Sequence, residues 1–241
     1  PLAEKYPSWS PYNYVLNNPV GMVDPDGKEV IVTIKNENGT RYVHIQVTAT
    51  LIDLTGNTGL NKPSSLTNEQ QEKMGGYADR IMESFNELFS FEDKDAKTVV
   101  TANLQLTVAS SVDDIKSTDH VLAIREGLGA HGSAEPGQRF IELSSKILDN
   151  VRDIENKSGK TKDGKASLER TAVHELGHSM GLIGHPGEPE TMPKNIDPKG
   201  NLMTSTVKKI AGLNLVIPQI NHIINQYEGG KLNGRKQLPW H

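Results

Sequence analysis

The sequence predicts an α+β fold in which a twisted mixed sheet carries a long backing helix. Two patterns predict it. Some segments place apolar residues at every second position, which is typical of half-buried strands, and others place them at every third or fourth position, which is typical of amphipathic helices. The chain has 241 residues, of which 35% are hydrophobic. This size is enough for a core, and it fits one domain or one domain with an appendage.

The first elements are expected to be two strands joined by a hairpin. Val30 to Lys35 and Tyr42 to Leu54 are rich in β-branched residues, and Asn38-Gly39 between them is typical of a tight turn. His44 falls on the outer face of the second strand and is expected to be a solvent or cross-strand residue. The inner face is formed by Val43, Ile45, Val47, Ala49 and Leu51.

A long helix should follow the hairpin. Thr67 and Gln70 have the spacing of a capping box, in which each side chain bonds the backbone N–H of the other residue. The residues after this cap recur along one side of a helix: Met74, Ala78, Ile81, Phe85 and Leu88. This would be the backing helix of the sheet.

Three further apolar stretches would complete the sheet. Each is bounded by polar residues or by Gly and Pro: Thr98 to Ala109, Val121 to Ile124, and Phe140 to Leu143. Gly127 to His131, before the last of them, is a candidate for the rim of a substrate cleft.

The run His174-Glu175-Leu176-Gly177-His178 predicts a helix that carries functional residues. Successive helical residues turn by ~100°, so the two histidines lie ~40° apart on one face, with Glu175 leaning toward the same space. Gly181 permits the turn that ends the helix. The opposite side is apolar and can pack on a core, with Leu168, Ala172, Leu176 and Met180 at four-residue spacing.

These residue types suit a zinc hydrolase. Neutral imidazoles hold Zn²⁺ without cancelling its charge, so the ion can lower the pKa of a bound water toward ~7. Glu175 would take a proton from that water and deliver it to the leaving amine. The alternative is a buried helix whose histidines only bond backbone groups.

The run and the residues after it resemble the metzincin metallopeptidases, whose pattern is His-Glu-x-x-His-x-x-Gly-x-x-His followed by a methionine turn. The chain departs from it by one residue, because Gly184 stands where the family has its third histidine and the histidine follows at 185. One extra residue moves a ligand by up to ~3.5 Å. His185 therefore needs a re-routed turn, and Gly184 is the residue best able to allow it.

The resemblance implies the residues of the site. His174, His178 and His185 would hold the zinc, and Glu175 would be the general base. The lesser candidates for the third ligand are Glu188, Glu190 and Asp197.

The downstream sequence extends the resemblance. Asn201-Leu202-Met203-Thr204 is similar to the methionine turn, so Met203 would form an apolar floor under the imidazoles; the alternative is an ordinary buried methionine. Ser205 stands where some members carry a tyrosine that donates to the oxyanion, so that role is not carried over. A C-terminal helix is indicated by Pro218, Ile220, Ile223, Ile224, Tyr227 and Gly229-Gly230.

Composition excludes several classes of function. The formal net charge of −4 argues against a nucleic-acid surface. The absence of cysteine excludes disulfides, thiol nucleophiles and thiolate metal sites. No signal peptide and no stretch of ~18 apolar residues is found, so we expect no membrane span, and the chain is cytosolic or a fragment exported by other means. The basic residues between 157 and 165, interrupted by glycines, indicate a flexible solvated loop.

Residues 1–27 differ from the rest. Tyr12-Asn13-Tyr14, Asn18-Pro19 and Asp24-Pro25-Asp26-Gly27 read as consecutive turns, and they are similar to the end of the core in Rhs (YD-repeat) polymorphic toxins. The resemblance implies that 1–27 is a junction segment and 28–241 a toxin domain. It also implies an enclosing core shell, an immunity protein and delivery to a target cell as a secreted effector. Asp24 and Asp26 match an autoproteolysis motif by type, and they also suit plain turns.

Taken together, the sequence predicts a zinc-dependent endopeptidase that acts on protein or peptide substrates as an Rhs toxin domain. A zinc hydrolase acting on peptidoglycan peptides and a catalytically inactive binding module are the alternatives. A nuclease has little support, because the chain has no basic cleft pattern and no carboxylate-rich nuclease motif.

Overall fold

The computed structural model describes residues 30–56, 67–115, 120–205 and 208–232. Within these ranges the chain forms seven strands, three α-helices and two short 3₁₀ turns, which confirms the predicted α+β class. The strands are β1 (Val30–Glu37), β2 (Thr40–Asp53), β3 (Phe91–Asp93), β4 (Thr98–Val108), β5 (His120–Arg125), β6 (Gly132–Ala134) and β7 (Phe140–Ser144). The helices are α1 (Asn68–Leu88), α2 (Leu168–Ser179) and α3 (Ile217–Glu228), and the 3₁₀ turns are η3 (Val112–Asp114) and η4 (Ser145–Ile147).

The strands form one mixed sheet, as predicted. Its order is β3-β4-β2-β5-β7-β6, and β1 also pairs with β2. The pairs β2–β4, β2–β5 and β5–β7 are parallel, whereas β1–β2, β3–β4 and β6–β7 are antiparallel. Strand β6 therefore ends the sheet on the side that faces α2.

The long strand β2 organises the sheet. Its first part pairs with β1 from Glu37↔Thr40 to Val30↔Val47, and its last part pairs with β5 from Ala49↔His120 onward. Its other edge is covered by β4. Strand β2 is therefore paired along both edges, and its inner-face residues belong to the main hydrophobic core.

The β1–β2 hairpin follows its local sequence. Asn38 and Gly39 both have positive φ, 51° and 77°, which is the conformation a two-residue hairpin turn requires. The five alternating residues predicted for the inner face of β2 are all buried. His44, on the other face, lies 3.0 Å from the Thr101 hydroxyl of β4 and is a cross-strand residue, as predicted.

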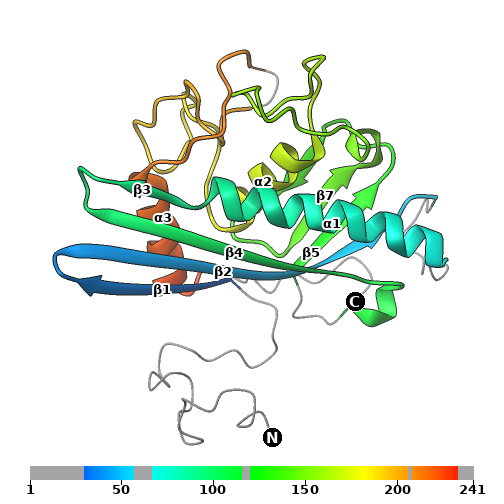
Figure 1. Ribbon diagram of the computed structural model, residues 1–241, viewed down its shortest axis with the longest axis horizontal. Helices are drawn as coiled ribbons and strands as arrows, with labels where there is room; N and C mark the ends of the chain where they lie inside the picture. The colour runs from blue at the N-terminus through cyan, green and yellow to red at the C-terminus, as the bar shows by residue number, and fades with distance from the viewer. Residues whose placement is uncertain (1–29, 57–66, 116–119, 206–207, 233–241) are drawn as a thin grey trace, which may run out of the picture.

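Helix α1 begins at the predicted capping box. The Thr67 N–H donates to Gln70 Oε1 at 2.9 Å, and the Gln70 N–H donates to Thr67 Oγ1 at 3.3 Å. The apolar side of the helix is buried at every predicted position. Figure 1 shows α1 lying across the sheet, with α2 close behind it, and the two helices are in contact.

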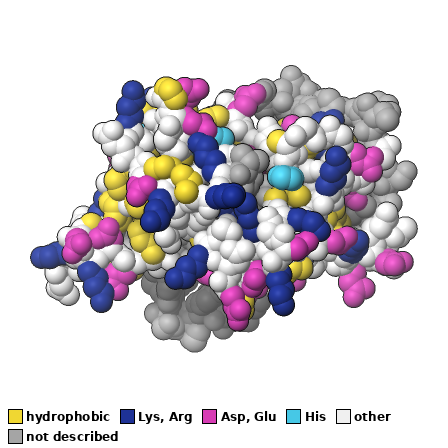
Figure 2. All heavy atoms as spheres, turned by 90° about the horizontal axis from the view of Figure 1, so that it is seen from above, with side chains coloured by type: hydrophobic (Ala, Val, Ile, Leu, Met, Phe, Trp, Pro, Cys, Tyr) yellow, Lys and Arg dark blue, Asp and Glu magenta, His cyan; other side chains and the backbone are white. Residues whose placement is uncertain are grey.

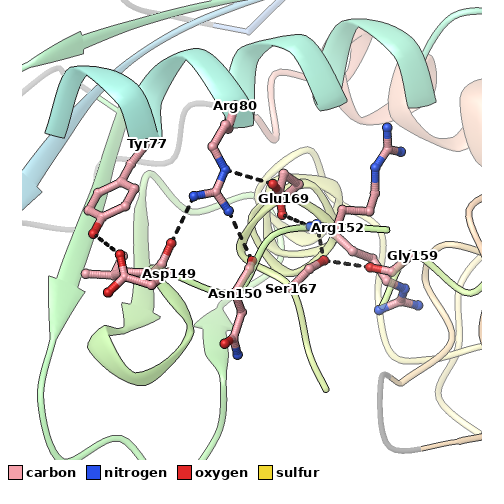
Figure 3. A network of polar contacts seen from close by, with 10 residues as sticks. Tyr77, Arg80, Asp149, Asn150, Arg152, Gly159, Ser167 and Glu169 are labelled. Atoms are coloured by element: carbon pink, nitrogen blue, oxygen red, sulfur yellow. Dashed lines mark hydrogen bonds and ion pairs between the residues drawn. The ribbon is translucent and has the colours of Figure 1, made fainter. Parts of the chain in front are cut away.

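A polar network ties α1 to α2 (Figure 3). Arg80 of α1 donates from Nε to Glu169 Oε1 of α2 at 2.8 Å. The same guanidinium donates to the carbonyls of Leu148 and Asn150, at 3.1 and 3.0 Å. Glu169 also accepts from the Arg152 N–H at 3.0 Å. One cation therefore fixes both α2 and the segment after η4.

The C-terminal helix α3 agrees with its prediction. Pro218 lies in its first turn, Gly229 follows its last residue, and the three predicted isoleucines, Ile220, Ile223 and Ile224, are buried in the main core. No described helix has the length and apolarity of a membrane span. On the face drawn in Figure 2, basic and acidic side chains are interspersed among the described residues.

Two short strands were not predicted. Strand β3 is a three-residue edge, and β6 begins at Gly132, directly after the segment proposed as a cleft rim. The predictions for residues 1–27, including the turns around Asp24 and Asp26, lie outside the described residues.

Candidate metal centre

Helix α2 is fixed at its start by a buried serine. Ser167 is the N-cap, whose Oγ accepts from the Arg170 N–H at 3.3 Å and donates to the Gly159 carbonyl at 2.6 Å (Figure 3). Gly159 packs so closely that a Cβ on it would lie 2.9 Å from the Arg170 side chain. The basic loop before α2 is therefore attached to the helix at this glycine. The apolar stripe predicted for α2 is fully buried.

Three histidines come together beside α2. His174 and His178 lie on the helix and His185 on the loop that follows it. One ring nitrogen from each lies within 4.8 Å of the other two. The ring centroid of His174 lies 4.8 Å from that of His178 and 5.3 Å from that of His185. Three imidazoles at these separations are close enough to bind one metal ion.

Each of the three rings is oriented by a hydrogen bond at Nδ1. His174 Nδ1 lies 2.9 Å from the Leu202 carbonyl, and His178 Nδ1 lies 2.7 Å from the Leu182 carbonyl. A carbonyl can only accept, so both Nδ1 atoms carry the proton and both Nε2 atoms keep a free lone pair. His185 Nδ1 lies 3.0 Å from Glu188 Oε2, which favours the same tautomer. The three donor atoms suit a divalent cation, and this pattern of bonded Nδ1 atoms is typical of metal-binding histidines.

Burial keeps the helical histidines neutral. It lowers the pKa of His174 well below its ordinary value, and the neighbouring His178 and Arg170 lower it further. Burial is also the main cause that lowers the pKa of His178. A neutral imidazole is the form that binds metals, so neither ring has to lose a proton on binding at neutral pH.

The turn between α2 and His185 absorbs the extra residue. Gly181 ends the helix with φ at 93°, and Gly184 has φ at 63°. A Cβ on Gly184 would lie 3.2 Å from the backbone of Thr191, so both conformation and space favour glycine there. A bridge between Ile183 and Met192 closes the loop. The expectation that Gly184 would re-route the chain is therefore confirmed.

The carboxylates considered as alternative ligands are not part of the cluster. Among the described residues, the group close enough to hold a metal consists of the three histidines. Glu188 instead bonds His185, and its other oxygen lies 3.3 Å from Lys208 Nζ. Partial burial raises the pKa of Glu188, but its bonds with His185 and Lys208 outweigh this and hold the pKa below its ordinary value. Glu188 is a partner that orients His185, whereas Glu190 and Asp197 are exposed.

Glu175 is buried next to the edge strand β6. A Cβ on Gly132 would lie 2.7 Å from Glu175 Cγ, so the absence of a side chain at Gly132 makes room for the carboxyl group. Burial raises the pKa of Glu175 to about 8, although a backbone hydrogen bond from Ala134 and the charge of Arg170 oppose the rise. A carboxyl group with this pKa can exchange a proton near neutral pH.

Met203 packs directly against α2. A Cβ on Gly177 would lie 2.5 Å from Met203 Sδ, so this glycine allows the sulfur to reach the helix backbone. Asn201 Oδ1 accepts from the Met203 N–H at 2.9 Å, and Asn201 is bonded in turn to Gln219 of α3. The turn that carries Met203 is thus fixed from both sides.

Buried Arg170 holds this turn against α2. The Nη2 atom of its guanidinium group donates to the carbonyls of Leu202 and Thr204, at 2.9 and 2.7 Å. The Leu202 carbonyl also accepts from His174 Nδ1. Burial lowers the pKa of Arg170 to about 10, so the side chain remains charged. The same carbonyl therefore links Arg170, His174 and the Met203 turn.

A cleft of about 350 Å³ opens beside the histidines. It is lined by Glu175, His174 and His185 on one side, and by the segment Leu128–Gly132 on another. The segment proposed as a rim therefore does line the cleft, and its His131 is exposed there. Ser205 lines the cleft as well.

Sequence reasoning missed several residues of this site. No local sequence signal indicated that Gly132 would make room for Glu175, or that Gly177 would make room for Met203. The role of Arg170 was also missed, although a charged residue on the buried side of an amphipathic helix is a recognisable signal.

Comparisons with known proteins do not assign the chain to a family. No protein-family model and no curated protein matches the chain. Among solved structures the chain is similar to one described as the structure of a chaperone–substrate complex, with a TM-score of 0.40 and 11% identity. The alignment covers 84% of this chain and 37% of the other, and a likeness this weak supports no inference about function.

The orienting role of Glu188 leads to a prediction about metal affinity. Glu188→Ala removes the acceptor that holds His185 Nδ1, so the affinity of the histidine cluster for a divalent metal ion should fall by about 10- to 100-fold. Chelator competition measures this. Glu190→Ala removes the same charge two residues away and should change the affinity little. Equal affinities of the two variants would contradict the assignment.

The buried Glu175 predicts a pH-dependent stability. Burial raises the pKa of Glu175 from about 4.5 to about 8. The contribution of this side chain to the free energy of unfolding is therefore most favourable below pH ~4.5 and is lost as the pH rises toward ~8. Glu175→Gln has no such loss. In metal-free protein, the difference in free energy of unfolding between Glu175→Gln and the parent should therefore shift in favour of the variant. The expected shift is about 1–3 kcal/mol between pH ~5 and pH ~8.

Urea unfolding with a chelator present tests this prediction. The histidine titrations occur in both proteins, so they largely cancel in the comparison. If the variant and the parent differ in stability by the same amount at both pH values, the folded protein does not raise the pKa of Glu175.

Proposed function

We propose that the chain is a zinc-dependent endopeptidase with a metzincin-like site. The observation that carries the proposal is that the three histidines lie within 4.8 Å of one another with their Nδ1 atoms occupied. A buried carboxyl group with a raised pKa lies in the same cleft. This combination suits hydrolysis better than a structural role, because a structural site has no use for Glu175.

The donor set favours zinc. His174, His178 and His185 would supply three neutral nitrogens, which is a common ligand set of catalytic zinc sites that keep one position open. When bound, zinc would activate a water molecule and polarise the substrate carbonyl. The described part of the chain offers no thiolate, and no carboxylate belongs to its metal-binding group.

Glu175 would carry the proton. Its carboxylate takes a proton from the attacking water and passes it to the nitrogen of the leaving amine. A pKa raised by burial suits both steps, because the group gains and loses a proton near neutral pH. The N–H of Ala134 keeps the carboxyl group in place meanwhile.

The other metzincin features have supporting contacts. Met203 packs against the backbone of α2 at Gly177, between the two helical histidines in sequence, which supports its proposed role in a methionine turn. Strand β6 ends the sheet and contacts α2, which suits the pairing of an extended peptide with the cleft edge. Ser205 lines the cleft without the phenol that some members use.

The biological setting is proposed from sequence resemblance alone. Residues 1–27 resemble the end of an Rhs core, so the peptidase would be the toxic domain of a polymorphic toxin delivered to a target cell. Its partners would be a protein substrate, a cognate immunity protein and the Rhs core shell. A peptidoglycan peptide remains the alternative substrate.

The proposal predicts the behaviour of Glu175→Gln. This variant should retain one zinc per chain, because the three histidines are unchanged, and it should lose at least about 100-fold in peptidase activity, the scale of a lost general base. Zinc is measured on protein purified without added metal, and activity by mass spectrometry of a treated proteome.

Purified cell wall, treated in parallel, separates the two substrates. Fragments released from cell wall but not from proteins would favour the peptidoglycan alternative. Full proteolysis by Glu175→Gln, or a parent protein free of metal, would contradict the proposed function.

A further inference from the structure

Lys146 is an unneutralised charge on the wall of the cleft. It lies in η4 and lines the same cavity as Glu175, His174 and His185. Among the described residues, no carboxylate forms an ion pair with its ammonium group. The residue is exposed and belongs to the lining of the space that a substrate would enter.

The carboxylates nearest to Lys146 in sequence are bonded elsewhere. Glu142 accepts from Arg125 at 2.9 Å. Asp149 accepts from the Tyr77 hydroxyl at 2.7 Å, and Lys73 lies 3.6 Å from the same oxygen. Each of these groups already has a cationic partner, so neither is arranged to neutralise Lys146.

The backbone that carries Lys146 is fixed from both sides. Before it, Ser144 Oγ accepts from the Lys146 N–H at 3.4 Å, and the Ser144 N–H donates to the His131 carbonyl at 2.8 Å. After it, the carbonyls of Leu148 and Asn150 accept from Arg80 (Figure 3). A charge on a fixed wall discriminates between substrates better than one on a free loop, because less conformational entropy is lost on binding.

The lining of the cleft also includes two hydroxyl residues, Thr171 and Ser205. The hydroxyl of Thr171, which is 2% exposed, has no hydrogen-bond partner among the described residues. It lines the cleft one helical turn before Glu175. Ser205 adds a second hydroxyl to the lining. Ser205, which is only partly buried, and Lys146 both carry donors of the kind that a carboxylate accepts from.

We propose that the cleft selects peptides with an acidic side chain, Asp or Glu, next to the cleaved bond, and that Lys146 makes this selection. The inference rests on the proposed function. Among the described residues that line the cleft, Glu175 is the only carboxylate and Lys146 the only lysine or arginine. Such a cleft favours an acidic side chain over its neutral amide.

Matched peptides test the selection. Cleavage sites are first mapped in a proteome digest, and peptides with blocked ends are then made that carry Glu or Gln next to the cleaved bond. We expect zinc-loaded protein to prefer Glu by about 3- to 10-fold in kcat/KM, the scale of one partly screened charge pair. Lys146→Met should reduce this ratio to about one, and Lys146→Glu should reverse it.

Two controls accompany these variants. Lys94→Met removes an equal charge from the exposed turn between β3 and β4, outside the cleft lining, and should keep the preference for Glu. A second set of peptides carries a free C-terminus next to the cleaved bond in place of the acidic side chain. A preference confined to that set would overturn the proposal in favour of recognition of a terminal carboxylate.

Binding separates failure of the selection from failure of the chemistry. Zinc-loaded Glu175→Gln should bind the Glu peptide more tightly than the Gln peptide by a similar ratio, measured by calorimetry. Equal cleavage of both peptides by the parent, or an unchanged preference in Lys146→Met, would overturn the role of Lys146 alone. If no peptide is cleaved while the binding preference holds, the proposed function fails and the charge selection stands as a property of binding.

Discussion

The site depends on one backbone carbonyl, that of Leu202. It accepts from His174 Nδ1 and from buried Arg170, and both residues lie on α2. These two bonds set the orientation of the His174 ring and attach the Met203 turn to the helix. The attachment is close because Gly177 leaves room for the methionine sulfur. A displacement of this carbonyl would therefore disturb both the histidine cluster and the Met203 turn.

Burial sets the charge state of the site. It disfavours the charged forms of His174, His178 and Glu175, so the imidazoles stay neutral and the carboxyl group keeps its proton to unusually high pH. A divalent cation bound by these rings would bring back a positive charge and favour the carboxylate. The metal-free site is thus prepared for a cation, and the pKa of Glu175 should fall once the cation is bound.

Local rules explain what the sequence predicted. The hairpin at Asn38, the capping box at Thr67 and the apolar stripe of α2 each depend on residues close together in the chain. Strand β6 was missed because three residues are too few for an alternating pattern. The partners of the ring nitrogens were missed for a different reason: the carbonyls of Leu182 and Leu202 have no signature in sequence, and only the folded backbone brings them to the histidines. The position of His185 beside the other two histidines could be predicted, because Gly184 before it allows the chain to turn.

X-ray absorption at the zinc edge reports the ligands of a bound metal without relying on activity, so it is the most direct test of the three-histidine site. We expect one zinc per chain with three imidazole nitrogens at ~2.0–2.1 Å and one further light-atom ligand from solvent. We also expect that His185→Ala reduces the imidazole count to two. A spectrum of the parent protein with two imidazoles and protein carboxylates, or protein that retains no zinc, would contradict the account.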